Sequence, residues 1–193
     1  MMRRIASLAL AGAVLASMAA FSTATALVGT ACTISGTSGD DVLRGTARRD
    51  VICGRGGDDR ILAQGGDDLI RGGPGHDRIF GGPGDDTIKG QGGRDLIEGR
   101  QGDDRIRGGA RRDRVEGERG ADVIRGGNGR DRLVGNQHDD RIKGGPDNDM
   151  LRGNAGDDTL DARDGSGGDT AEGMEGSDTC LADPGDSLTS CEA

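Results

Sequence analysis

The 193-residue chain has no tryptophan, no tyrosine and only two phenylalanines. Large apolar and aromatic side chains normally fill the core of a globular domain, so this scarcity argues against an ordinary hydrophobic core. Glycine, by contrast, occurs 39 times. Abundant glycine is typical of collagen, of disordered segments and of repeat proteins with many tight turns. No Gly-X-Y triplet runs along the chain, which excludes collagen.

The glycines belong to a nine-residue repeat. From Gly36 to Asp161 the chain divides without gaps into fourteen nonapeptides, of which GGPGHDRIF and GGPGDDTIK are two. Position six of the repeat is Asp in all fourteen, and position eight is Ile, Leu or Val in all fourteen. Position one is Gly in thirteen repeats, with Ala63 as the exception, and position four is Gly in ten. This fixed phase predicts a single repetitive architecture.

The repeat phase continues beyond the fourteen copies. A two-residue insertion after Asp161 is followed by Asp169 and Asp178 at position six, and Ile34 falls at position eight of a degenerate earlier copy. We therefore expect one domain over residues 27–193, with an N-terminal cap at 27–35, the fourteen repeats at 36–161, and degenerate repeats with a C-terminal cap at 162–193.

Each repeat contains the signals of one strand and one turn. Positions seven to nine alternate outward, inward, outward, which predicts a short strand with one buried apolar residue. Positions one to six are rich in glycine and can adopt the positive-φ conformations of a tight turn. Two repeats then make one coil, and the coils stack into an all-β parallel β-roll. Seven coils, about 34 Å long, enclose only two ladders of position-eight side chains, a core too thin to hold the stack alone.

Position six supplies a second source of stability. Turns of alternate repeats lie on the same edge of the roll, which brings successive aspartates to about 5 Å, where bare carboxylates repel. A calcium ion is coordinated by six to eight oxygens. Two carboxylates would supply part of this coordination shell, and carbonyl oxygens of the glycine turns would complete it. The alternative is that Asp only favours the turn through Asx hydrogen bonds. That role would also admit Asn or Ser, and neither occurs at position six.

The most regular repeats mark the predicted calcium sites. Six same-edge pairs stand out: Asp41/Asp59, Asp59/Asp77 and Asp77/Asp95 on one edge, and Asp68/Asp86, Asp86/Asp104 and Asp104/Asp122 on the other. Together with turn carbonyls, the predicted metal ligands are Asp41, Asp59, Asp68, Asp77, Asp86, Asp95, Asp104, Asp122, Asp131 and Asp158. Four repeats have Arg48, Arg111, His138 or Asp147 in place of the position-four glycine, and are either weak sites or spacers.

The N-terminus has the features of a secretory signal peptide at residues 1–26. Arg3 and Arg4 form a basic start, residues 5–21 are apolar or small, and Ala24-Thr25-Ala26 is a small-x-small cleavage site. The apolar run is short for a membrane span, so export is favoured over a retained anchor. We expect a secreted, extracellular protein.

Four cysteines lie near the two ends of the repeat array, Cys32 and Cys53 at one and Cys180 and Cys191 at the other. An even count in an exported chain predicts disulfides, and proximity favours two local bridges among the three connectivities. Each bridge would contribute about 2–4 kcal/mol. Metal ligation is the weaker alternative, because it favours closer pairs such as CxxC.

The repeats resemble the RTX, or haemolysin-type, calcium-binding nonapeptide GGxGxDxUx. The resemblance implies a parallel β-roll loaded with several calcium ions. The end sequences CTISGTSGDDVLRGTARRDVICGRGGDD and DPGDSLTSCEA also resemble small secreted bacterial calcium-binding proteins made only of such repeats. RTX toxins and proteases typically carry an uncleaved C-terminal export signal. Here the predicted signal is N-terminal, which implies the general secretory route.

Outward-pointing basic residues indicate an alternative function. On one sheet, position nine reads Arg71, Lys89, Arg107, Arg125 and Lys143, a basic column able to bind a polyanion such as an acidic polysaccharide or cell-wall polymer. The plainer interpretation is that these charges keep a flat sheet from aggregating. Nucleic acid is disfavoured by the net charge of −9 and by the lack of aromatics that stack on bases. An accessory subunit of a secreted enzyme is the third alternative.

No catalytic constellation stands out in the sequence. His76 and His138 occupy turn positions in unrelated repeats, without a Ser or Cys nucleophile at a partner spacing. We expect no enzymatic activity, no cofactor other than calcium and no membrane insertion.

Overall fold

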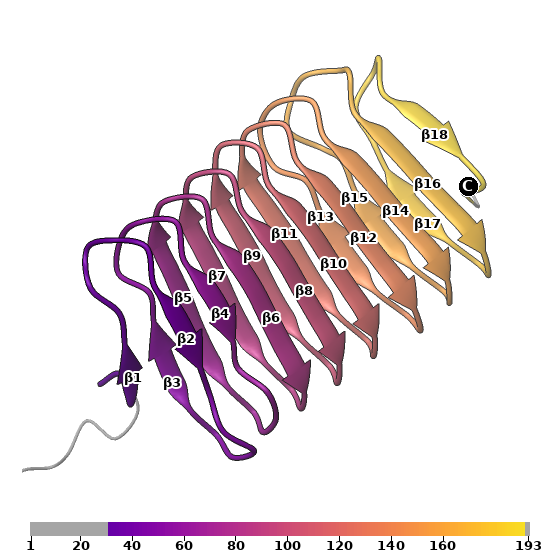
Figure 1. Cartoon of the computed structure of the whole chain (residues 1–193). Helices are drawn as coiled ribbons and strands as arrows, with labels where there is room; N and C mark the ends of the chain where they lie inside the picture. The colour runs from indigo at the N-terminus through magenta and orange to yellow at the C-terminus, as the bar shows by residue number, and fades with distance from the viewer. Residues whose placement is uncertain (1–30, 192–193) are drawn as a thin grey trace, which may run out of the picture.

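The structure is a computed structural model, and it describes residues 31–191. The predicted signal peptide and residues 27–30 of the predicted cap lie outside the described residues. Residues 31–191 form eighteen strands and no helix, so none of their elements is a helix able to cross a membrane. Figure 1 shows successive strands stacked as coils of one long roll. The prediction of an all-β parallel β-roll is confirmed.

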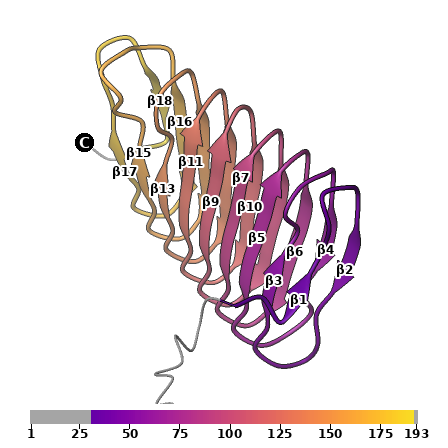
Figure 2. The same cartoon turned by 90° about the vertical axis from the view of Figure 1, so that its left-hand side faces the viewer.

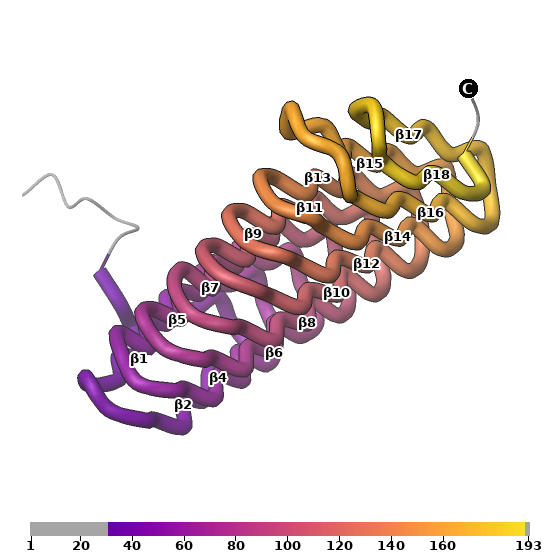
Figure 3. The backbone as a smooth tube through the Cα atoms, turned by 90° about the horizontal axis from the view of Figure 1, so that it is seen from above, coloured from indigo at the N-terminus to yellow at the C-terminus, as the bar shows by residue number. Residues whose placement is uncertain are grey.

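The chain alternates between two parallel nine-stranded sheets, seen facing each other in Figures 2 and 3. One sheet contains β1 (Ile34–Ser35), β3 (Val51–Cys53), β5 (Leu69–Pro74), β7 (Thr87–Gly92), β9 (Arg105–Ala110), β11 (Val123–Asn128), β13 (Arg141–Lys143), β15 (Thr159–Asp161) and β17 (Thr179–Leu181). The other contains β2 (Val42–Arg44), β4 (Arg60–Leu62), β6 (Arg78–Pro83), β8 (Leu96–Gln101), β10 (Arg114–Arg119), β12 (Arg132–Gln137), β14 (Met150–Ala155), β16 (Thr170–Glu175) and β18 (Ser187–Thr189).

The register follows directly from the repeat length. Ile70 of β5 lies beside Ile88 of β7, and Ile88 lies beside Ile106 of β9, in steps of two nonapeptides. The two-residue insertion is absorbed in a loop, because Leu151 of β14 pairs with Ala171 of β16 and the ladder continues. Two repeats therefore make one coil, as the phase of the sequence predicts.

The core consists of two rows of position-eight side chains, one row from each sheet. Ile61, Ile70, Ile79 and Ile88 are all fully buried, whereas their strand neighbours at positions seven and nine point outward. Ile34 and Cys180 pack against the two ends of this cluster. Burial of a full Ile side chain stabilises by about 1.5–3 kcal/mol, but most strands supply only one large buried apolar residue.

The turns are shorter than predicted. In the middle of the roll, strands such as β5 and β7 run on through positions one to three of the next repeat, so the expectation that positions one to six form the turn is wrong there. Position two bends the chain with a left-handed conformation, for example at Gln64 (φ 80°) and Gln91 (φ 85°). From Arg55 to Asn154 every repeat makes the same bend, so the interstrand ladder continues through it and Gly73 still pairs with Gln91.

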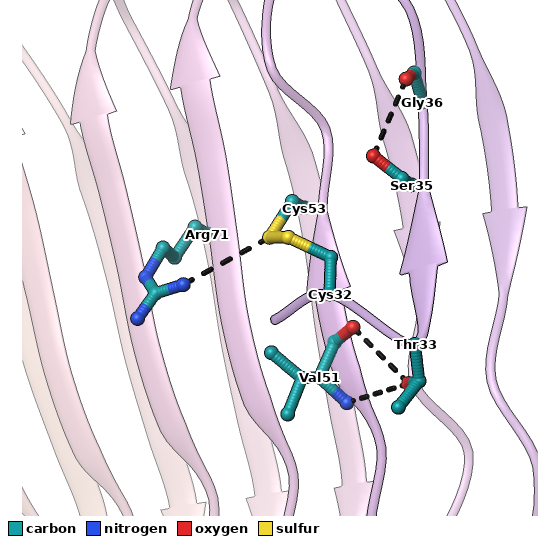
Figure 4. The surroundings of a disulfide bond; sticks show 7 residues. All are labelled: Cys32, Thr33, Ser35, Gly36, Val51, Cys53 and Arg71. Atoms are coloured by element: carbon teal, nitrogen blue, oxygen red, sulfur yellow. Dashed lines mark hydrogen bonds between the residues drawn. A yellow bond between two sulfur atoms is a disulfide. The ribbon is translucent and has the colours of Figure 1, made fainter. Parts of the chain in front are cut away.

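Disulfides tie down both ends, between Cys32 and Cys53 and between Cys180 and Cys191, as predicted. The first bridge holds the N-terminal strand β1 against β3 (Figure 4). Beside it, the hydroxyl of Thr33 accepts a 2.9 Å hydrogen bond from the main-chain N–H of Val51 and lies 3.2 Å from the carbonyl oxygen of the same residue. The open end of the core is thereby closed by covalent and polar contacts.

Candidate metal centre

The position-six aspartates form two buried columns, one on each edge of the roll. We call the edge that carries the turns of the first, third and later odd repeats the odd edge, and the other the even edge. From Asp59 to Asp178 each of these side chains is at most 3% exposed. Carboxylates are almost never buried so completely unless they are paired. Each aspartate therefore has to find compensating partners within the stack.

One oxygen of each carboxylate holds neighbouring coils in register. The main-chain N–H of Asp59 donates to Oδ1 of Asp77 at 2.9 Å, and that of Asp77 donates to Oδ1 of Asp95 at 2.9 Å. The same bond recurs along both edges, including across the insertion, where Asp149 donates to Asp169 at 2.7 Å. A backbone amide that would otherwise be buried without an acceptor is thus satisfied by the next coil.

The other oxygen has no hydrogen-bond partner among the described residues. A buried, unpartnered acceptor is costly, and more so when it is charged. The arrangement is shared by fourteen buried Oδ2 atoms, those of Asp59, Asp68, Asp77, Asp86, Asp95, Asp104, Asp113, Asp122, Asp131, Asp140, Asp149, Asp158, Asp169 and Asp178.

Burial has a direct electrostatic consequence. It raises the pKa of Asp77 to about 7 and that of Asp104 to about 8, because the charged carboxylate loses its hydration. The amide hydrogen bond to each carboxylate opposes this shift, and neighbouring aspartates of the column add to it. At neutral pH these side chains therefore require either a proton or a cation.

Main-chain oxygens converge on the same place. A methyl group at Gly99, position one of its repeat, would collide with Oδ2 of Asp104 and lie 2.9 Å from the carbonyl oxygen of Gly117, one coil along. Gly90 stands in the same relation to Asp95 and to the carbonyl oxygen of Gly108. At Gly90 and Gly99 glycine is therefore favoured because two oxygens lie where a Cβ would be, and not because of its φ angle.

The donor set suits a hard cation. Among residues 31–191 no three His, Cys, Asp or Glu side chains are grouped as a metal cluster, so the side chains alone do not make a site. Carboxylate Oδ2 atoms together with turn carbonyls provide oxygen donors only, which is the chemistry that calcium prefers. The residues present therefore fit calcium.

Two turns depart from this pattern at position one. Ala63, which precedes Asp68, and Ala162, which precedes Asp169, have fully buried methyl groups where the other turns have glycine. In glycine turns such as those of Gly90 and Gly99, a methyl group at this position would collide with Oδ2. Asp68 was predicted as a ligand, and its Oδ2 is buried and unpartnered like those of the glycine turns.

In the first turn on each edge, Oδ2 of the position-six aspartate has hydrogen-bond partners. Oδ2 of Asp41 accepts hydrogen bonds from the main-chain N–H of Thr37 at 2.6 Å and from its hydroxyl at 2.9 Å. Thr46 does the same for Asp50, at 2.8 and 2.9 Å. Asp41 was among the predicted ligands, but its free oxygen is already satisfied within its own turn. The other nine predicted aspartates all have the unpartnered Oδ2.

Sequence reasoning left out several members of the columns. The unpartnered Oδ2 also occurs at Asp113, Asp140, Asp149, Asp169 and Asp178. Three of these lie in repeats that lack the position-four glycine. Arg111, His138 and Asp147 nevertheless adopt the left-handed φ of that glycine, at 80°, 75° and 79°. The invariant Asp at position six was the signal that would have included them.

Position five carries further columns that the sequence reasoning did not single out. On the even edge, Oδ1 of Asp85 accepts the main-chain N–H of Asp103 at 2.9 Å, and Oδ1 of Asp103 accepts that of Ala121 at 2.9 Å. On the odd edge the column begins in the same way but then changes to arginine, at Arg94, Arg112 and Arg130.

The predicted basic column at position nine is aligned in the structure. Arg107 lies between Lys89 and Arg125 in register across β7, β9 and β11, and the column ends at Arg71 and Lys143. Lys143 forms an ion pair with Asp161 at 2.9 Å. Nothing in this alignment tests whether the column binds a polyanion, which stays a prediction.

Comparison with known families agrees with the geometry. The family model for the RTX calcium-binding nonapeptide repeat matches residues 35–70, 63–97, 71–106, 98–133, 134–167 and 162–187, which together span well over half of the chain. No curated protein sequence matches it. The repeats, the parallel β-roll and the buried aspartate columns are all accounted for by one assignment: the chain belongs to the RTX calcium-binding nonapeptide repeat family.

Proposed function

We propose that this protein is a secreted, calcium-dependent structural β-roll whose coils become stably stacked only when calcium compensates the aspartate columns. The family match supports calcium binding by the repeats. The finer proposal is that binding and folding are coupled in this chain, because a ligand that binds only the folded state stabilises that state.

One observation carries the proposal: fourteen buried carboxylates each keep an unpartnered Oδ2. Position-eight residues provide one buried apolar side chain per strand, which is little to set against so many desolvated charges. The stacked, folded state is favoured over the unfolded state only if these buried charges are neutralised. Calcium, when bound, would supply the positive charge for the whole column.

Different atoms of the chain would fix the register of the coils and hold the ion. Oδ1 of each aspartate holds the amide of the preceding coil, so the register does not depend on the cation. Oδ2 and the turn carbonyls would hold the ion, in the turns of both edges. Glycine at position one keeps side chains out of the space between these oxygens.

Export fits the same proposal. The predicted signal peptide and the two disulfides favour an oxidising, extracellular location. Extracellular calcium modules bind at about 10⁻⁴–10⁻³ M, so the chain would stay unfolded before export and fold outside the cell.

A calcium titration of residues 27–193, followed by far-UV circular dichroism, tests the proposal. We expect a cooperative gain of β signal between about 10⁻⁴ and 10⁻³ M calcium. Magnesium is the control, because it requires strict octahedral geometry and keeps its water shell. A chain that is already fully folded in chelator would overturn the coupling, and one that stays unfolded in calcium would overturn the calcium-dependent roll.

A further inference from the structure

The odd edge of the roll has a long charged groove of about 1150 Å³. It runs along the stack from the coil of Asp58 to that of Thr170, and the buried position-six aspartates form its floor. Its walls are two rows of arginines from positions five and seven: Arg94, Arg112, Arg130, Arg78, Arg114 and Arg132. We call this feature the arginine groove.

The arginines of the position-five row are not explained by the fold. Upstream in the same column, Oδ1 of Asp58 accepts the main-chain N–H of His76 at 2.7 Å, and Nδ1 of His76 accepts that of Arg94 at 2.7 Å. A guanidinium group has no acceptor, so Arg94, Arg112 and Arg130 cannot continue this chain of hydrogen bonds. At these three residues the odd edge lacks a contact that the even edge makes at most of its turns, with an interruption at Ala121.

Few of these charges are neutralised internally. Of the six arginines, only Arg114 forms an ion pair within residues 31–191, with Glu116 at 2.7 Å. The other rim carboxylate, Glu98, is paired with Arg100 outside the two rows. Arg132 has a buried Nε without a hydrogen-bond partner, beside the sulfur of Met150. The groove therefore contains five arginines that have no ion-pair partner within residues 31–191.

The spacing of the rows selects the form of a ligand. Strand pairing places Arg114 directly beside Arg132, and the turns of Arg94, Arg112 and Arg130 follow one another coil by coil. Neighbouring arginines of the position-five row are thus about 4.8 Å apart at their backbones. In the position-seven row, Leu96 separates Arg78 from Arg114. A straight row at this spacing matches an extended polymer with a negative charge on each unit, and guanidinium binds carboxylate through paired hydrogen bonds.

We propose that the arginine groove binds an extended, carboxylated polysaccharide. The site differs from the position-nine column of Arg71 to Lys143, which lies on the opposite sheet. A duplex or single-stranded nucleic acid fits less well, because the chain has a net charge of −9 and no tryptophan or tyrosine to stack on bases. The groove needs stacked coils, whatever ion or proton neutralises the aspartates beneath it.

Two variants with equal charge change test the site. R94Q/R112Q/R130Q removes three charges from the groove, and R71Q/R107Q/R125Q removes three from the position-nine column. The probe is fluorescent oligogalacturonate, with its methyl-esterified form as the uncharged control, measured by anisotropy in calcium. All proteins are first shown by circular dichroism to be folded, so a failure to bind is distinct from a failure of calcium to fold the chain. R112Q alone serves if the triple variant does not fold.

We expect the groove variant to bind at least about tenfold more weakly, since three charge-assisted contacts are lost, and R112Q to show a smaller loss in the same direction. The column variant should stay within about twofold, because only screened, distant charge is removed. Equal losses in the two variants, or a loss confined to the column variant, would overturn the proposal. So would equal binding of the esterified probe, or displacement of the probe by single-stranded DNA at equal charge concentration.

Discussion

The main-chain N–H of Asp86 donates a 2.8 Å hydrogen bond to Oδ1 of Asp104, one coil further along the roll. The same carboxylate leaves Oδ2 buried without a hydrogen-bond partner. One oxygen thus fixes the register of adjacent coils, and the other carries the charge that has to be compensated. Mutation can separate these two roles.

Asp104→Asn keeps an acceptor at Oδ1 and replaces the charged oxygen by a neutral amide. Without calcium we expect the variant to be more stable than the wild type by about 1–3 kcal/mol, because an uncompensated buried charge is removed. With saturating calcium we expect it to be less stable, because a ligand oxygen is lost. Urea unfolding in both conditions measures the two effects, with an osmolyte added to populate the calcium-free folded state.

The neighbouring residue provides a matched control. Asp103 is exposed, and its Oδ1 accepts the main-chain N–H of Ala121 at 2.9 Å, a bond that Asn can also make. Asp103→Asn should change the free energy of unfolding by less than about 0.5 kcal/mol in either condition. An effect of Asp104→Asn with the same sign in both conditions would contradict the assigned roles.

The pH dependence of folding should reverse with calcium. In the folded state burial raises the pKa of Asp68 to about 6, of Asp77 to about 7 and of Asp140 to about 8, whereas an unfolded Asp titrates at about 3.9. The resulting stabilisation is complete below about pH 4 and is lost as the pH rises through about 6–8. We expect calcium-free protein to gain β signal on acidification from pH 8 to 5.

With calcium, acidification should instead weaken the fold, because protons compete for the same oxygens. Circular dichroism at a series of pH values, in metal-free buffer and in millimolar calcium, distinguishes the two slopes. A metal-free β signal that does not change between pH 8 and 5 would show that the aspartates are not what opposes folding.

Position-one glycine can be tested by adding a methyl group. Gly99→Ala would place it against Oδ2 of Asp104 and 2.9 Å from the carbonyl oxygen of Gly117, so we expect a loss of about 1–3 kcal/mol at saturating calcium and weaker calcium binding. Gly92→Ala is the control, because a methyl group there meets no atom within 4 Å. It should be neutral or stabilising by up to about 1 kcal/mol. Equal effects of the two substitutions on the calcium midpoint would refute the steric argument.

Three of the non-glycine residues at position four, Arg111, His138 and Asp147, should carry backbone strain. Arg111 has φ 80°, in the left-handed region, so Arg111→Gly is expected to stabilise the calcium-loaded protein by about 1 kcal/mol. Arg112, its exposed neighbour, has no positive φ. Arg112→Gly should therefore destabilise by up to about 1 kcal/mol, through the added freedom of the unfolded chain. Chemical denaturation midpoints of the two variants give the comparison, and a destabilised Arg111→Gly would argue against strain.

The architecture was readable from the sequence because two side chains repeat with the period of the fold. Ile88 and Asp86 occupy fixed positions in their repeat, and the structure places the first in the core and the second in a column. The strand boundaries were harder to predict from the sequence. Position two is left-handed at Gln64 and Gln91, residues that do not favour this conformation, so only the stacking of coils reveals the bend.

Some features of the candidate site were missed, both within a repeat and between repeats. Within the first repeat, the hydroxyl of Thr37 donates a hydrogen bond to Oδ2 of Asp41, and the invariant Asp gives no sign of this local contact. To predict the arginine groove, one must know that the arginines of positions five and seven in alternate repeats lie on the same edge. A single repeat does not contain that information. Reading every second repeat as one column would have exposed it.

The contrast between the two edges gives the chain a larger unit than the nonapeptide. Because the odd edge presents arginines at position five where the even edge presents aspartates, loss of one repeat would move every later turn to the opposite edge and divide the arginine row between two sides. Loss of two consecutive repeats would shorten the row and leave its sides intact. Relatives that keep the groove should therefore differ in length by whole coils, and an odd number of repeats gained or lost should coincide with its disappearance.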